Sequence, residues 1–263
     1  MGRPAPVFLL LVHLPGSVSD ATMERAEAHL ESSERLELAK IGDLLTRTRR
    51  TLGRALLRRT LGHALGCAPW SLPLVRSPTG KPELPGRLAF SQARTGDSLA
   101  IAWSLQGPLG IDIELPEARF RDEVNRLVAQ AMDAPLRASF GGGEAAPFQA
   151  WTAVEAIRKA SGDGLDGLGF DEPSDPVRTG APGAFRLIDL PDTPGVIGEQ
   201  GPGGLRSWWL HPFQTRTAAV PGPSGDRGIA VPGCIAWPAP SVPAEREVVV
   251  TTLAAARVSG YLG

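Results

Sequence analysis

Two acidic residues, Asp112 and Glu114, alternate with isoleucines in the stretch GIDIE, residues 110–114. Side chains of a β-strand repeat every two residues, so both carboxylates would lie on one face and Ile111 and Ile113 on the other. Carboxylate oxygens are ligands that magnesium accepts alongside substrate phosphates. The stretch therefore predicts either a magnesium site on a strand or a half-buried strand with an acidic, solvated face.

A second acidic position lies in the stretch WTAVEAIRKASG, residues 151–162. Glu155 and Lys159 are four residues apart, so they would share one face of a helix, with the acid N-terminal to the base. This spacing is typical of a surface ion pair, and it also suits a functional acid beside a cation. Trp151 precedes Glu155 by four residues and would most often be a core residue.

Basic residues concentrate in the segment 47–59. Its arginines flank an apolar leucine stripe, as in an amphipathic helix. Such a helix either grips an anion or presents a solvated face. The six arginines are Arg47, Arg49, Arg50, Arg54, Arg58 and Arg59. A single lysine, Lys81, lies in the turn-rich loop 77–86.

The elements that must position these residues follow from hydrophobic periodicity. A buried strand is expected over 7–14, a helix-rich region over 20–65, and two strands on either side of 95–97. Helices are expected over 118–132 and 148–162, the second ended by Gly162. Further strands are expected over 184–190, 206–213, 228–237 and 247–253. Helices and strands mix without regular βαβ alternation, which favours an α+β fold.

Composition excludes several classes of function. The 263 residues carry a formal net charge of −1, with 42% apolar and 21% charged residues. There is no basic excess for nucleic acid, and the apolar run 7–14 is too short to span a membrane. The two cysteines lie far apart and make a disulfide framework unlikely, so a reducing cytoplasm is expected. Neither they nor the four scattered histidines show metal-ligand spacing. A secretory signal at 7–14 is the alternative.

Four motifs occur in a fixed order: Gly80-Lys81-Pro82, then Phe90, then Gly110-x-Asp112-x-Glu114, then the helix stretch with Trp151, Glu155 and Lys159. This succession resembles the 4′-phosphopantetheinyl transferase superfamily, the type that activates surfactin synthetase. The resemblance covers about residues 45–170 of the sequence.

The resemblance implies two similar α+β subdomains related by a pseudo-twofold axis, with the ligand site at their interface. The first half would be residues 1–107, with coenzyme A phosphate contacts, and the second 108–263, with the magnesium-binding acids and the catalytic helix. It implies a monomeric, magnesium-dependent enzyme of the holo-[acyl-carrier-protein] synthase type. Such an enzyme moves the 4′-phosphopantetheine group of coenzyme A to a serine of an apo acyl or peptidyl carrier protein and releases adenosine 3′,5′-bisphosphate.

The resemblance also implies roles for particular residues. Asp112, Glu114 and Glu155 would bind Mg²⁺, and Glu155 would also be the general base for the serine. Lys159 would neutralise charge that develops on the phosphates. The residues expected to bind coenzyme A phosphates are Arg58, Lys81 and Arg94.

Two positions depart from the family pattern. Ala93-Arg94-Thr95 replaces the usual Ser-His-Ser, and Val154 replaces the lysine that precedes the helix glutamate. They keep open an alternative in which a catalytically weakened homologue binds carrier proteins without transfer. An unrelated metal-dependent phosphohydrolase using the same carboxylates is a third alternative.

Overall fold

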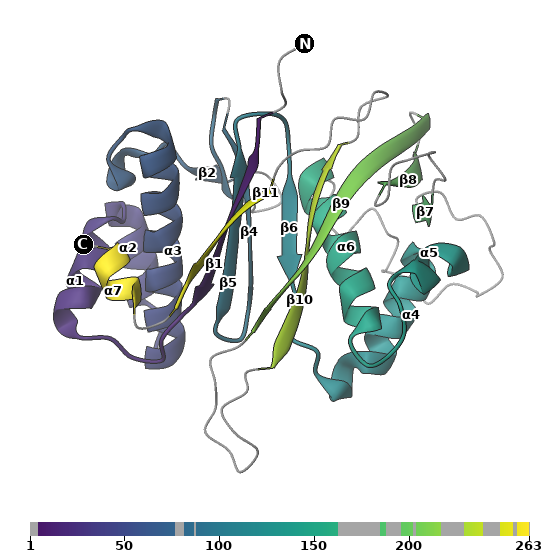
Figure 1. Ribbon diagram of the computed structural model, residues 1–263. Coiled ribbons are helices and arrows are strands. Elements are labelled where there is room, and N and C mark those ends of the chain that lie inside the picture. Colours follow the sequence, from purple (N-terminus) through teal and green to yellow (C-terminus); the bar gives the residue numbers. More distant parts are fainter. Residues whose placement is uncertain are drawn as a thin grey trace.

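The computed structural model describes most of the chain (Figure 1). The described residues are 5–76, 82–86, 88–162, 185–187, 196–201, 204–216, 229–238, 248–254 and 257–262. Helices lie at the two outer sides and strands fill the middle. The strands form two larger sheets and a two-stranded hairpin of β2 (Val75–Arg76) and β3 (Pro82–Glu83).

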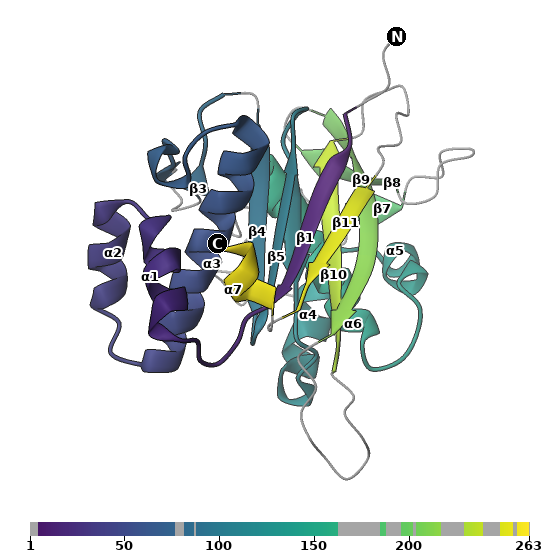
Figure 2. The same cartoon turned by 60° about the vertical axis from the view of Figure 1, so that its left-hand side comes forward.

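The first sheet has the strand order β11-β1-β5-β4. These strands are β11 (Val248–Leu253), β1 (Val7–His13), β5 (Ser98–Ser104) and β4 (Ala89–Thr95). β1 pairs with β11 in parallel and with β5 antiparallel, and β5 pairs antiparallel with β4. Gly96 joins β4 to β5 with a positive φ of 55°, a conformation that glycine adopts without steric cost. Figure 2 shows β1 beside β11.

Helices cover one face of this sheet: α1 (Asp20–Ala28), α2 (Ser32–Ala39), α3 (Leu44–Leu65) and the short α7 (Val258–Tyr261). The Ser19 and Asp43 side chains cap α1 and α3 by accepting hydrogen bonds from the backbone N–H groups of Thr22 and Thr46. The leucine stripe of α3, including Leu52 and Leu56, packs in one core with Leu10, Ile101 and their neighbours. The amphipathic pattern therefore fixes which side of α3 is available for its arginines.

The second sheet has the order β6-β10-β9-β8-β7, with antiparallel neighbours throughout. Its strands are β6 (Gly110–Ile113), β10 (Ala230–Pro238), β9 (Gly204–Arg216), β8 (Val196–Gly201) and β7 (Phe185–Leu187). The nearby helices are α4 (Arg121–Ala131), α5 (Ala134–Ser139) and α6 (Ala146–Ser161). Short 3₁₀ helices also occur: η1 (Pro69–Ser71) follows α3, and η2 (Ala118–Phe120) precedes α4.

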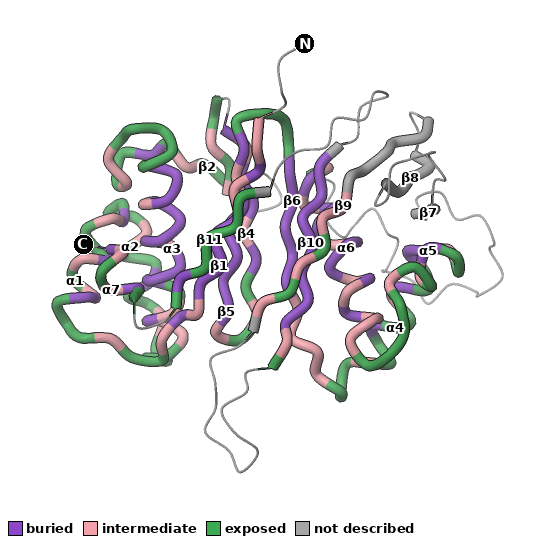
Figure 3. The backbone as a smooth tube through the Cα atoms, in the orientation of Figure 1, coloured by how far each residue is buried: buried purple, intermediate pink, exposed green. Residues whose placement is uncertain are grey.

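Another core joins the two sheets, and Figure 3 shows the buried strands in the middle of the molecule. Leu9 of β1 and Ala93 of β4 belong to the same cluster as Ile111, Ile113 and Ile235. Backbone N–H groups on the β6 side also donate to hydroxyls of β4: Ile111 to Ser91 at 3.2 Å and Leu115 to Thr95 at 3.1 Å. These contacts hold the acidic strand beside the strand that carries Arg94.

The predicted α+β class is confirmed, and strands β1, β4, β5, β6, β7, β9, β10 and β11 occur where the sequence pattern placed them. The pseudo-twofold relation and the boundary at residue 107 stay predictions, and β11 crosses that boundary to pair with β1 in the first sheet. The strand β8 was not predicted, because its glycine-rich sequence carries no alternating apolar pattern. Among the described residues, no helix has the length and apolar character needed to cross a membrane.

Candidate functional site

The site begins with a close contact between helix α6 and strand β6. A Cβ atom at Gly110 would overlap the Ala156 carbonyl oxygen and lie 2.6 Å from the Ala160 backbone nitrogen. Real Cβ atoms do not approach backbone so closely, so only glycine allows α6 to rest directly on β6. The glycine of the GIDIE motif therefore brings the acidic strand and the acidic helix together.

Across this contact, Asp112 of β6 pairs with Lys159 of α6. The Lys159 Nζ lies 2.6 Å from the Asp112 Oδ1, and the side chains are 29% and 9% exposed. Ile111 and Ile113 point to the core between the sheets, as the alternation predicts. Asp112 is buried, which excludes the solvated acidic face as its environment. Lys159 pairs with this acid across the fold, in addition to any interaction with Glu155 along its helix.

Glu114 and Glu155 complete a group of acids that influence one another electrostatically. Burial is the main cause that raises the pKa of Glu155 to about 7, and the charge of Asp112 adds to it. The pKa of Glu114 is also raised to about 7, first by burial and then by Asp112 and Glu155. Burial raises the pKa of Asp112 despite the opposing charge of Lys159. The three carboxyls thus share a region where a further positive charge would be stabilised.

The acids have one unsatisfied atom that a cation would fit. The buried Asp112 Oδ2 has no hydrogen-bond partner, although buried carboxylate oxygens normally have one. Hard carboxylate oxygens are the donors that Mg²⁺ accepts. Within the described parts of the chain, no three Asp, Glu, His or Cys side chains already converge as a metal site. The unpartnered Asp112 Oδ2 fits a divalent cation, and the assignment of Asp112, Glu114 and Glu155 as its ligands stays a prediction.

Next to the acids lies a cleft of about 320 Å³ that we call the cationic cleft. It is lined by residues from α3, β4, β5 and α6: Arg50, Gly53, Arg54, Gln92, Ala93, Arg94, Leu99 and Lys159. Burial lowers the pKa of Arg94, and the charges of Arg50 and Arg49 lower it further. Several cations that repel one another in a half-buried cleft form a site that an anion would stabilise.

Of the residues expected to bind coenzyme A, Arg94 lines this cleft and Arg58 does not. Arg58 is 1% exposed and donates through Nε to Glu34 at 2.5 Å and through Nη1 to the carbonyl oxygens of Pro69 and Leu72 at 2.9 and 3.2 Å. These bonds tie α2, α3 and η1 together. Lys81 lies outside the described residues.

The cleft contains instead two arginines of α3 that no sequence pattern distinguished from their neighbours. Arg50 and Arg54 are four residues apart, which rotates them by only about 40° around the helix. Arg58, eight residues from Arg50, is rotated by about 80°, which carries it under α2. The i, i+4 spacing of Arg50 and Arg54 was a visible signal, but the orientation of the helix decided which arginines reach the cleft.

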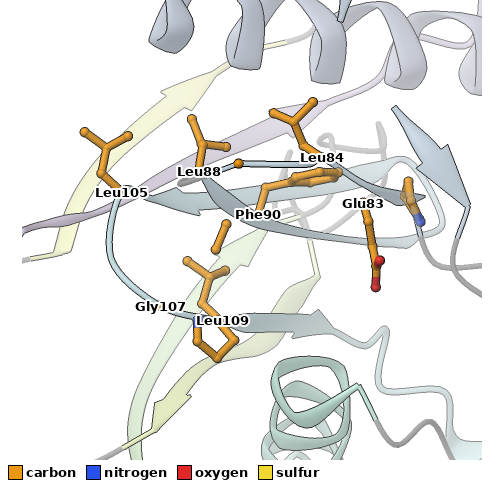
Figure 4. Close-up of a pocket in the computed structure, with 11 residues that line it drawn as sticks. Glu83, Leu84, Leu88, Phe90, Leu105, Gly107 and Leu109 are labelled. Carbon is orange, nitrogen blue, oxygen red and sulfur yellow. The ribbon is translucent and has the colours of Figure 1, made fainter. Parts of the chain in front are cut away.

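A second pocket, of about 510 Å³, lies near the other end of β4 (Figure 4). We call it the apolar pocket, because it is lined mainly by Leu84, Leu88, Phe90, Leu105 and Leu109. Glu83 also lines it, as do residues that precede β4 and β6, among them Gly86, Gly107 and Pro108. Such walls suit an uncharged group and supply no nucleophile. The buried thiol of Cys234, beside Asp112 in the β6–β10 pairing, has a raised pKa through burial and is also a poor nucleophile.

Comparison with known proteins finds relatives of one kind. The chain is 34% identical over 121 residues to a putative 4′-phosphopantetheinyl transferase of Synechocystis, covering 43% of this chain and 49% of the relative. It is 29% identical over 190 residues to a phosphopantetheinyl transferase of Thraustochytrium, covering 65% and 66%. It is 27% identical over 213 residues to the 4′-phosphopantetheinyl transferase HetI of Nostoc, covering 71% and 87%.

The matched region thus spans about half the length of the Synechocystis relative and just under two thirds of the Thraustochytrium relative. No protein-family model matches the chain.

Proposed function

Because the chain belongs to the 4′-phosphopantetheinyl transferase superfamily, we propose that it transfers the 4′-phosphopantetheine group of coenzyme A to a serine of an apo acyl or peptidyl carrier protein. The observation that carries the proposal is the position of Lys159. This side chain pairs with the buried acid Asp112 and also lines the cationic cleft. The Lys159 ammonium therefore lies between the cleft proposed to bind phosphates and the acids proposed to bind a divalent metal.

In this proposal the cationic cleft binds the phosphate groups of coenzyme A. Arg50, Arg54 and Arg94 supply guanidinium groups, which bind phosphate oxygens through charge-assisted and often bidentate hydrogen bonds. Arg54 already contacts Glu37 of α2 at 3.2 Å, which limits its rotamers. The cleft supplies binding and orientation rather than covalent chemistry.

The acids would hold Mg²⁺ through Asp112, Glu114 and Glu155. When bound, the ion supplies positive charge to the pyrophosphate and stabilises the leaving group. Phosphoryl transfer requires mainly this electrostatic stabilisation and correct positioning.

The chain's own residues would then handle the proton. The serine Oγ of the carrier protein bonds to the phosphorus that bears the pantetheine arm, and the bond from that phosphorus to the oxygen of the leaving adenosine 3′,5′-bisphosphate breaks. The serine proton passes to Glu155, directly or through a water, and Lys159 donates a hydrogen bond to a phosphate oxygen. Without a metal, burial and the charge of Asp112 raise the pKa of Glu155 to about 7, and a cation bound beside it would keep the carboxylate charged and able to accept the proton.

The apolar pocket would receive an uncharged part of coenzyme A, either the adenine ring or the pantetheine arm. Phe90 at this pocket and Arg94 at the cationic cleft lie on the same strand, about 13 Å apart for four residues of β-structure. Leu105 is exposed at the pocket, so a Leu105→Glu variant should fold. Weaker binding of both adenosine 3′,5′-bisphosphate and coenzyme A would place the adenine ring there, and weaker binding of coenzyme A alone would place the pantetheine arm.

A mass measurement tests the proposed transfer. Apo carrier protein incubated with the chain, coenzyme A and Mg²⁺ should gain the mass of one phosphopantetheine group. Asp112→Ala and Glu155→Gln should abolish the gain, whereas Glu123→Gln, at an exposed position on α4, should not. No gain with any of several acyl and peptidyl carriers would refute the proposal. The surfactin-synthetase type, the monomeric state and the cytoplasmic location remain predictions.

One observation favours a second candidate, a homologue that binds carriers without transfer. Val154, at the position of the family's lysine, is fully buried in the apolar core around α6, so it supplies no cation to the site. Such a protein would bind carriers equally well with or without coenzyme A and Mg²⁺. Release of phosphate from simple esters without a carrier would point instead to a phosphohydrolase.

A further inference from the structure

Lys159 takes part in two neighbouring sites. Its ammonium contacts Asp112 Oδ1, and its side chain also forms part of the wall of the cationic cleft, with Arg50, Arg54 and Arg94. The side chain is 29% exposed, which leaves its ammonium room to move. A lysine side chain has a flexible four-carbon stem that ends in a compact ammonium group. The ammonium can therefore contact either Asp112 or an anion in the cationic cleft without movement of the helix.

The contact with Asp112 satisfies an electrostatic need that a bound metal would also satisfy. A buried carboxylate without a cation is costly, and Lys159 supplies the positive charge at one of its two oxygens. A divalent cation at the same carboxylate would stand within a few ångströms of the ammonium and repel it. The ion pair with Lys159 therefore stabilises the Asp112 carboxylate chiefly when no metal is bound.

We propose that Lys159 exchanges partners when the acids bind a divalent cation, leaving Asp112 and turning its ammonium into the cationic cleft. Cation binding would then add a positive charge to the place where the phosphates bind. The inference rests on the proposed function, since it takes Mg²⁺ and coenzyme A phosphates as the two ligands.

This exchange makes the two binding steps cooperative. A cation that releases Lys159 strengthens anion binding, and by linkage the anion strengthens cation binding by the same factor. Lys159 is then a coupling residue in addition to its role next to the phosphates.

The chain allows a direct test because it has only three lysines, Lys40, Lys81 and Lys159. With ¹³C-labelled lysine, the three side-chain Cε signals can be followed by NMR during a titration with MgCl₂ alone, without coenzyme A or carrier. The signal that disappears in Lys159→Arg is assigned to Lys159. Lys40 is exposed at the end of α2 and serves as the internal control.

The Lys159 signal should shift with Mg²⁺ while the Lys40 signal stays in place. In Asp112→Asn the Lys159 signal should be displaced before any metal is added and should no longer respond to Mg²⁺. A Lys159 signal that is unchanged at millimolar Mg²⁺ in the wild-type chain would overturn the proposal, and this result depends on no variant being folded.

Calorimetry gives a second readout, with adenosine 3′,5′-bisphosphate as the anion. In the wild-type chain, Mg²⁺ should tighten its binding by about 5-fold or more, the lower end of typical coupling. In Lys159→Met the factor should fall toward one. Direct contact between metal and anion would survive this substitution, so an equal factor in both proteins would overturn the proposal.

The result is separable from that of the proposed function. A carrier that gains mass while the Lys159 signal ignores Mg²⁺ would support the transferase and reject the exchange of partners. A Lys159 signal that follows Mg²⁺ without any mass gain would support the exchange and reject the transferase.

Discussion

At the scale of single residues, the two glutamates with a pKa of about 7 should make the stability of the folded state depend on pH. Because Glu114 and Glu155 bind protons more tightly in the folded state than at their ordinary pKa of 4.5, the folded state holds more protons between about pH 4.5 and 7. Stability therefore falls as pH rises through this window. Thermal unfolding of the metal-free chain at a series of pH values should show this fall.

The pH effect has two internal controls. Glu155→Gln should make the fall in stability shallower, because the amide does not titrate and only Glu114 then contributes. Saturating Mg²⁺ should also flatten it, because a bound cation favours the charged carboxylates. A metal-free profile that rises between pH 5 and 7 would contradict the cause assigned to these shifts.

Arg94 makes a second prediction at this scale. It lines the cationic cleft beside Arg50, and a hydrogen bond to a charged group contributes about 1.5–3 kcal/mol. Arg94→Ala should therefore weaken binding of adenosine 3′,5′-bisphosphate by about 10- to 100-fold, as measured by calorimetry. Arg126→Ala, at an exposed position on α4, is the matched control and should bind as the wild type does.

At the scale of elements, Gly110 sets the distance between β6 and α6. Gly110→Ala must push the helix away from the strand, since the new methyl group would overlap backbone atoms that cannot yield as a flexible side chain would. We expect the free energy of unfolding, measured by urea denaturation, to fall by about 1–3 kcal/mol. Gly142→Ala is the control, because a Cβ there meets nothing within 4 Å. Equal unfolding midpoints for the two variants would contradict the close contact.

Arg58, unlike Arg94, holds elements together, because it bonds Glu34 and the carbonyl oxygens of Pro69 and Leu72. Replacing it with Met should remove about 3–5 kcal/mol of stability, because Glu34 and two carbonyl groups lose a buried partner. Affinity for adenosine 3′,5′-bisphosphate, measured well below the unfolding temperature, should change little. A variant of wild-type stability with lost affinity would restore the predicted role of Arg58 in binding coenzyme A phosphates.

The sequence predicted elements better than the contacts between them. Leucine spacing in α3 and the alternation at Ile111 and Ile113 depend on neighbours in the chain, so both could be read locally. The pairing of Asp112 with Lys159 joins residues 47 positions apart, and the cationic cleft joins α3, β4, β5 and α6. Such contacts depend on how whole elements pack, which no local pattern specifies.

At the scale of the whole molecule, the first sheet depends on the strand β11. Val7 of β1 pairs with Val248, and Leu253, Val258 and Leu262 lie in the same core as α3. A chain ending at residue 247 should lose all of these contacts and unfold at a lower urea concentration than Leu253→Ala, which by itself should cost about 2–5 kcal/mol. Unfolding of the truncated chain at the wild-type midpoint would show that β11 adds little.

The parallel pairing of β1 with β11 also bears on how the chain is made. Its residue partners are 241 positions apart, as the pairing of Val7 with Val248 shows. On a ribosome β1 emerges 241 residues before its partner Val248 in β11, so one edge of its sheet stays open while those residues are made. Contacts of such long range fold slowly, and an open strand edge can pair wrongly with other chains. The growing chain is therefore expected to be most exposed to misassembly, and most in need of chaperones, before residue 253 has left the exit tunnel.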